Sequence, residues 1–100
     1  MYEETVDQSS TDGQNFVELL RSRGIHAGIK LDKGLVILGG TNDETATQGL
    51  DGLAARAASF YAKGCRFAKW RAVIKIGNGT PSELAIRETA HTLARYGSIC

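Results

Sequence analysis

The apolar positions of this chain fall into blocks whose spacing predicts helix, strand, helix, strand and helix in that order. A short helix is expected over about Gln14–Arg23, followed by a short strand over Ile25–Leu31. Asp32–Gln48 is expected to be mostly loop, although Leu35–Leu38 is a brief apolar run that could be extended. A loop of this length in a compact domain is often functional.

The second half of the chain has the clearest helical period. A helix is expected from about Thr47 to Lys63, where apolar residues recur at helical spacing. These residues are Leu50, Leu53, Ala54, Ala57, Ala58 and Tyr61. A strand over Arg66–Ile76 follows.

The last helix is expected to begin with Thr80 as its N-cap, Pro81 in the first helical position and Glu83 completing a capping box. Its apolar stripe consists of Ile86, Ala90, Leu93 and Ala94. The alternation of elements favours an α/β fold, with helices packed on a parallel sheet. Two or three strands would leave such a sheet with open edges, and the chain stops inside an apparently unfinished helix. We therefore expect residues 1–100 to be a single incomplete segment of a larger domain.

Composition narrows the function classes only slightly. The chain has 100 residues, 42% hydrophobic and 23% charged, with a formal net charge of +1. This charge gives no general reason to expect nucleic acid or an acidic membrane as a partner. No apolar run reaches the roughly 18–20 residues that span a bilayer, and the acidic amino end does not resemble a signal peptide, so a cytoplasmic location is expected. Cys65 and Cys100 lack metal-ligand spacing and are expected to be reduced thiols, with Cys65 packed as a small apolar residue.

Charged residues on the two predicted strands provide the candidate chemistry. Lys69 and Arg71 are expected to point to one face of their strand, and Lys30 and Asp32 to one face of theirs. Cations within an apolar strand need anionic partners, because a buried unpaired charge is costly. Those partners could be structural carboxylates or the oxygens of an anionic substrate, and a simple solvated face is the remaining alternative.

A nucleic-acid platform is a third, weaker interpretation. Phe67 and Trp70 are interleaved with basic residues, as in single-strand binding surfaces. The five basic residues are Lys63, Arg66, Lys69, Arg71 and Lys75. They do not share one strand face, so the sequence disfavours nucleic acid. His26 and His91 are isolated and are expected to be packed or exposed rather than to bind a metal.

Several collinear stretches together resemble class I fructose-bisphosphate aldolase, the Schiff-base type. They are GIKLDKG at 28–34, GGTNDETATQGLDGL at 39–53, FAKWRAVIKIG at 67–77, TPSELAI at 80–86 and LARYGSIC at 93–100. The resemblance covers essentially the whole chain, and its mild departures touch none of the charged residues above. It implies a partial TIM (β/α)8 barrel, with Ile25–Lys30 as the third strand and Phe67–Ile74 as the fourth.

The resemblance also implies a reaction, the reversible cleavage of fructose 1,6-bisphosphate to dihydroxyacetone phosphate and glyceraldehyde 3-phosphate. A lysine amine forms an iminium with the substrate ketone, and this route needs no cofactor and no metal. Lys30, Lys69 and Arg71 match the family's active-site cations, and Asp32 matches a neighbour of less certain role. All four are expected to bind the sugar phosphate.

The family's Schiff-base lysine and acid/base glutamate would both follow Cys100, so no catalytic residue is assigned within the chain. We expect the isolated chain to be inactive and the complete enzyme to be a homotetramer. The alternative function is a non-catalytic aldolase remnant that binds sugar phosphates weakly or acts through protein contacts.

Overall fold

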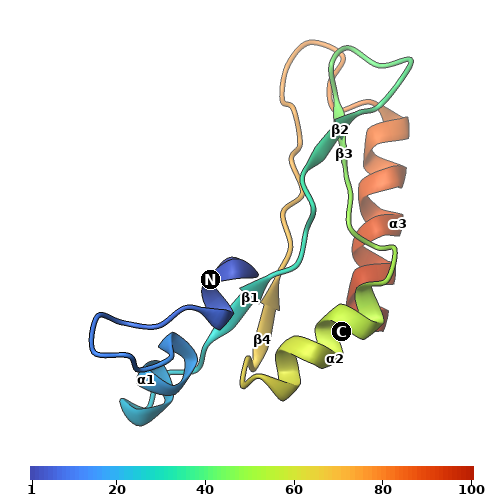
Figure 1. Cartoon of the computed structure of the whole chain (residues 1–100). Helices are drawn as coiled ribbons and strands as arrows, with labels where there is room; N and C mark the ends of the chain where they lie inside the picture. Colours follow the sequence, from blue (N-terminus) through green and yellow to red (C-terminus); the bar gives the residue numbers. More distant parts are fainter. The chain divides into compact units, whose positions relative to one another are not determined.

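The computed structural model describes all 100 residues and contains three α-helices, one 3-10 helix and four short strands (Figure 1). The chain divides into two compact units. The first unit comprises Met1–Leu31 and Gly52–Lys69, and the second comprises Asp32–Asp51 and Trp70–Cys100. None of the helices combines the length and the apolar character needed to cross a membrane.

The first unit is built around two parallel strands. Strand β1 (Gly28–Lys30) pairs with β4 (Phe67–Lys69), and the two strands run side by side in Figure 1. This pairing confirms the parallel arrangement expected from the alternation of elements. The other elements of the unit are the 3-10 helix η1 (Glu4–Asp7) and the helices α1 (Phe16–Ser22) and α2 (Leu53–Ala62).

Met1 adds a third backbone segment beside β1. Its amino group donates to the Gly28 carbonyl at 2.6 Å, and the Lys30 amide donates to the Met1 carbonyl at 2.9 Å. This pattern, in which one residue bonds to the two residues that flank its partner, is that of a parallel ladder. Strand β1 therefore has a parallel neighbour on both of its hydrogen-bonding edges.

The core of the first unit collects small and medium apolar side chains from most of its elements. The buried residues are Val6, Val17, Ala27, Ile29, Leu31, Leu53 and Cys65. Burial of Cys65 confirms its expected packing role, and the same burial raises the pKa of its thiol. The apolar face expected on the second helix is confirmed at Leu53, which is buried. Tyr61, expected on the same face, is 64% exposed.

The second unit contains an antiparallel hairpin that the sequence predicted only in part. Strand β2 (Leu35–Ile37) confirms the extended run, but its partner β3 (Thr45–Thr47) lies in the segment expected to be loop. Two of the three β3 residues are threonines, whose β-branched side chains suit a strand. The helix expected from about Thr47 begins instead at Leu53, after Gly52 with a φ of 67°.

Both predicted parallel strands are shorter than expected. The strand expected over Arg66–Ile76 is a ladder only at Phe67–Lys69, and the one expected over Ile25–Leu31 only at Gly28–Lys30. After Lys69 the backbone is held by isolated contacts. Thr47 Oγ1 donates to the Arg71 carbonyl at 2.7 Å, and Lys75 Nζ donates to the Asn42 carbonyl at 2.6 Å.

Helix α3 (Glu83–Ile99) begins two residues later than the sequence predicted. Its N-cap is Ser82, whose hydroxyl accepts from the Ala85 amide at 3.1 Å, so the expected Thr80 cap and the capping box with Glu83 are wrong. A residue distant in sequence also contacts this end of the helix. The buried side chain of Glu44 accepts a hydrogen bond from the Ser82 amide at 2.8 Å.

The apolar stripe expected on α3 is exposed. Ile86 and Leu93 are 50% and 41% exposed, whereas Ala85 and Thr92 are the buried residues of the helix. Trp70 packs against the helix, with its ring centroid 4.9 Å from that of Tyr96. Burial also raises the pKa of the Tyr96 hydroxyl.

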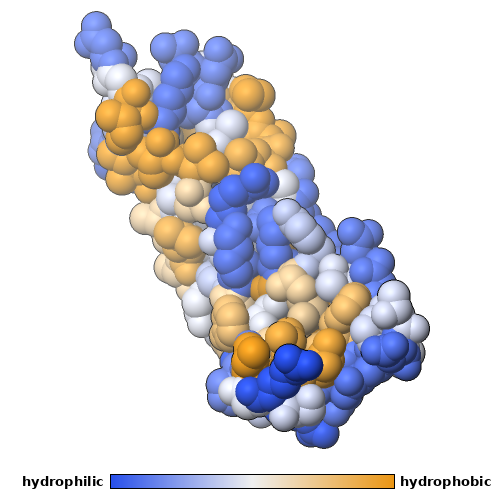
Figure 2. All heavy atoms as spheres, turned by 90° about the vertical axis from the view of Figure 1, so that its left-hand side faces the viewer, coloured by the Kyte–Doolittle hydropathy of each residue, from blue (hydrophilic) through white to orange (hydrophobic).

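Apolar side chains of the hairpin are also exposed. Figure 2 shows hydrophobic residues gathered in the upper part of the visible face. Val36 and Ile37 of β2 are 44% and 60% exposed. The second unit thus presents apolar surface on both its hairpin and its helix.

The cap assignment predicts different effects for two neighbouring hydroxyl residues. Ser82→Ala removes the side-chain acceptor of the first turn of α3, at a typical cost of about 1 kcal/mol. We expect amide exchange at Ala85 to accelerate about fivefold, as this energy implies. Thr80→Ala is the matched control and should leave exchange there nearly unchanged. Equal acceleration in both variants would show that Ser82 is not the cap.

Candidate functional site

Two lysines lie at the carboxyl ends of the paired parallel strands. Lys30 is the last residue of β1, Lys69 is the last residue of β4, and the two are direct partners in the register. Partners in a parallel ladder project to the same face of the sheet. The pairing therefore brings two lysines that are far apart in sequence to the same face of the sheet.

Both lysines line a cavity of about 400 Å³ in the first unit. The other lining residues are Met1, Tyr2, Gly28, Ile29 and Phe67. The cavity therefore has apolar and aromatic walls and carries its charge on two cations. This combination suits a small anionic ligand that also has carbon surface to bury.

Contacts within the unit shape this cavity. The Lys30 ammonium lies 5.7 Å from the centroid of the Tyr2 ring, within the range of a cation–π interaction. The Phe67 ring lies directly against Gly28, where a Cβ atom would overlap it. A glycine at this position lets the ring lie across β1 and form one wall of the cavity.

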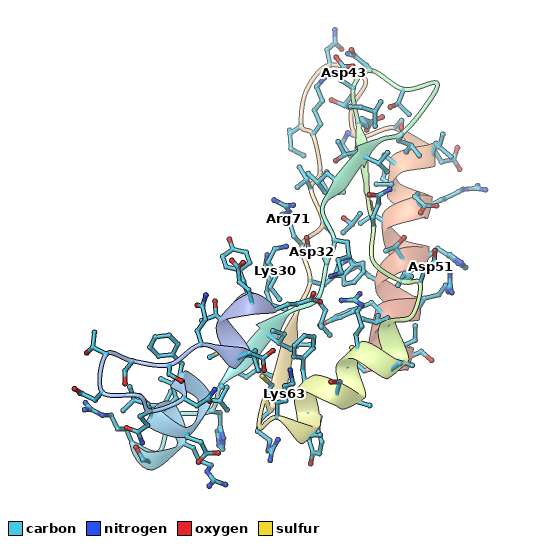
Figure 3. The ribbon with its side chains drawn as sticks, in the orientation of Figure 1. Lys30, Asp32, Asp43, Asp51, Lys63 and Arg71 are labelled. Carbon is cyan, nitrogen blue, oxygen red and sulfur yellow. The ribbon has the colours of Figure 1, made fainter.

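Asp32 and Arg71 form a separate pair in the second unit (Figure 3). The Asp32 side chain is completely buried, and its Oδ1 lies 3.5 Å from Nη2 of Arg71. Arg71 keeps 42% of its side chain exposed. A guanidinium has five N–H donors, so Arg71 can face a buried carboxylate and still offer donors to a ligand.

The expected strand faces extend beyond the strands that the structure contains. β1 ends at Lys30 and β4 ends at Lys69, so Asp32 and Arg71 both lie beyond their strands. The expectation that Lys30 shares a face with Asp32, and Lys69 with Arg71, therefore stays a prediction. Within the first unit Lys30 pairs with Lys69 across the ladder, and within the second unit Asp32 lies beside Arg71.

Comparison with known proteins gives this geometry its context. The family model described as fructose-bisphosphate aldolase class-I matches residues 1–100. The chain belongs to the class I fructose-bisphosphate aldolase family. The resemblance expected from the sequence motifs is thereby confirmed.

Relatives of this aldolase segment are similar over its whole length. Cytosolic fructose-bisphosphate aldolase 5 of Arabidopsis thaliana is 60% identical over 100 residues, and the cytoplasmic isozyme of Spinacia oleracea is 59% identical. A solved structure of the Plasmodium falciparum aldolase, in complex with TRAP and a small-molecule inhibitor, matches with a TM-score of 0.96 at 51% identity. The match covers 99% of this chain and 29% of the Plasmodium falciparum chain. The chain spans 28% of the length of both plant relatives.

The basic residues considered for nucleic acid have partners within the protein. Lys63 forms an ion pair with Asp7 at 2.7 Å, and Arg66 donates to the carbonyls of Tyr61 and Cys65. Arg71 and Lys75 make the contacts described above. These contacts engage four of the five basic residues within the protein.

His26 and His91 are exposed, as one of the two expected alternatives stated. No group of three or more His, Cys, Asp or Glu residues in the chain is arranged to hold a metal ion. One functional candidate was missed by the sequence analysis, namely Arg56 of α2. Its side chain reaches the carboxyl end of β1, where it donates to the Leu31 carbonyl. The available signal was its place next to the apolar stripe, three residues after Leu53.

The buried carboxylate makes the Asp32–Arg71 pair testable by a double-mutant cycle. Asp32→Asn and Arg71→Met, alone and together, should reveal a coupling energy of about 1–2 kcal/mol in the free energy of unfolding, within the range for contacting residues. The coupling is expected because loss of Arg71 alone would remove a cation that faces a buried carboxylate.

The control is the cycle for Glu83 and Arg87, whose side chains are 78% and 77% exposed. Exposed pairs of this spacing contribute only about 0.3–0.5 kcal/mol. Urea unfolding measures both cycles. A coupling no larger for the buried pair than for the exposed one would contradict the assignment.

Proposed function

We propose that this chain is a central segment of the TIM-barrel domain of a fructose-bisphosphate aldolase, and that it supplies the third and fourth barrel strands. The parallel ladder supports this assignment, because Met1, β1 and β4 form three adjacent parallel backbone segments in sequence order. A barrel built from consecutive βα units has that order. The mixed helix–strand architecture and the aldolase structural neighbour agree with it.

The observation that carries the function is the pairing of Lys30 with Lys69 at the carboxyl ends of two parallel strands. Active sites of TIM barrels lie at that end of the strands. Here the two lysines line one cavity, which would receive the sugar phosphate. We further propose that Arg71 binds substrate oxygens while the buried Asp32 orients its guanidinium.

The proposed reaction is the reversible cleavage of fructose 1,6-bisphosphate in glycolysis and gluconeogenesis. A lysine elsewhere in the complete enzyme forms an iminium with the substrate ketone, which accepts the electron pair when the carbon–carbon bond breaks. Lys69 would hold substrate oxygens near that bond. Its positive charge would also favour the neutral, nucleophilic form of the Schiff-base lysine, because a nearby like charge lowers a lysine pKa.

The location and assembly of the complete enzyme are part of this proposal. The similar plant proteins are named cytosolic or cytoplasmic, and we propose the same location here. The homotetramer rests on the family resemblance.

Two measurements test the proposed function. The purified 100-residue chain should not cleave fructose 1,6-bisphosphate, because it holds no residue that matches the family's Schiff-base lysine. The same chain should support cleavage when it is grafted into Arabidopsis aldolase 5 in place of the matched residues. The kcat/KM of the graft should lie within about tenfold of the parent value, which corresponds to a change of at most about 1.4 kcal/mol in the activation free energy.

Within the graft, Lys69→Met should lower kcat/KM by about 100-fold or more, since it removes a charged contact from the reacting region. Lys63→Met is the matched control, because it removes a lysine of the same unit that pairs with Asp7 at the surface. Equal activity of the two variants would refute the role of Lys69. A folded but inactive graft would favour the non-catalytic remnant.

A further inference from the structure

We propose that Arg56 is a positioning residue that fixes the carboxyl end of β1 and thereby sets the place of Lys30 relative to Lys69. The consequence for catalysis rests on the proposed function. The contacts themselves belong to the first unit alone and can be tested without activity.

The guanidinium of Arg56 makes a forked contact with one backbone carbonyl. Both Nη1 and Nη2 lie 3.2 Å from the oxygen of Leu31, the residue that directly follows Lys30. Nη1 also lies 2.5 Å from Oε1 of Glu3. The Arg56 and Glu3 side chains are only 21% and 30% exposed, so water competes weakly for these contacts.

The contacts of Arg56 with Leu31 and Glu3 are called the clamp below. Leu31 links this clamp to strand β4. Its amide donates to the Lys69 carbonyl at 3.0 Å, so its two backbone polar groups are both held. Leu31 is 0% exposed, and its carbonyl would have no water to replace a lost donor. A shift of the Leu31 peptide would therefore change the position of Lys30 and of its partner on β4.

Glu3 links the clamp to the third parallel segment. It lies two residues after Met1, whose backbone pairs with β1. One guanidinium thus contacts β1 directly and the Met1 segment through Glu3, while Leu31 continues the connection to β4. The carboxyl ends of all three segments depend on a side chain from helix α2.

Arginine is the residue type that suits this position. Its planar fork presents several N–H donors in fixed directions, whereas a lysine ammonium is a single compact centre on a flexible stem. The substitution Arg56→Lys would keep the ion pair with Glu3 but could not reproduce the paired contacts to the Leu31 carbonyl. A graded series, with arginine best, lysine intermediate and methionine worst, is the signature of this geometry.

The experiment compares Arg56→Met and Arg56→Lys in the grafted aldolase, with Arg66→Met as the matched control. Arg66 also lies in the first unit and donates to two carbonyls, those of Tyr61 and Cys65, but it does not line the cavity. Hydrogen exchange is followed in peptides that cover residues 29–33. Values of kcat and KM are measured at a temperature where circular dichroism shows equal folded fractions.

For Arg56→Met we expect faster exchange at the Leu31 amide and a fall in kcat/KM of about 10- to 100-fold, the scale expected for a displacement of about 1 Å in an active site. Most of the fall should be in kcat, and Arg56→Lys should recover part of it. Arg66→Met should change neither quantity.

The proposal is overturned if Arg56→Met lowers only the melting temperature and leaves exchange at Leu31 and kcat unchanged. An inactive graft that retains Arg56 would instead reject the proposed function. Exchange at Leu31 in that same graft would still decide whether the clamp exists.

Discussion

The parallel hydrogen bonding between β1 and β4 is the constraint on which the candidate site depends. Each strand is only three residues long, so the ladder offers few backbone bonds, and it brings together residues that are 39 positions apart in sequence. It sets the partnership of Lys30 with Lys69 and brings Phe67 against Gly28. The cavity between these groups exists only while the ladder holds. Contacts that reinforce the ends of such a short ladder therefore matter more than they would in a long sheet.

The order and type of most elements could be predicted from the sequence, because apolar periodicity reports which faces are buried. The lengths of the strands could not. Residues 70–76 have the apolar, β-branched character of a strand, yet a ladder also needs a partner backbone, and composition carries no information about its presence. The β3 strand was missed because its three residues form a strand only through their pairing with Leu35–Ile37.

Local signals were weakest where two candidates compete. Thr80 and Ser82 are both good N-cap residues, and only the backbone path selects Ser82. At the site, the sequence drew attention to each lysine through strand alternation along its own chain segment, which carries no information about a partner strand. The structure groups them across the ladder. Arg56 was overlooked because a carbonyl acceptor such as that of Leu31 has no signature in side-chain identity.

The contact between Glu44 and the Ser82 amide has a consequence for the order of folding. It closes the beginning of α3 with a side chain that is 38 positions away in sequence, next to the β2–β3 hairpin. The first turn of the helix therefore gains one of its acceptors only after the hairpin has formed and docked. Closing a loop of this size costs entropy before the contact returns any energy. Formation of α3 should thus be cooperative with the hairpin, and its amino end should become ordered later than its middle during folding.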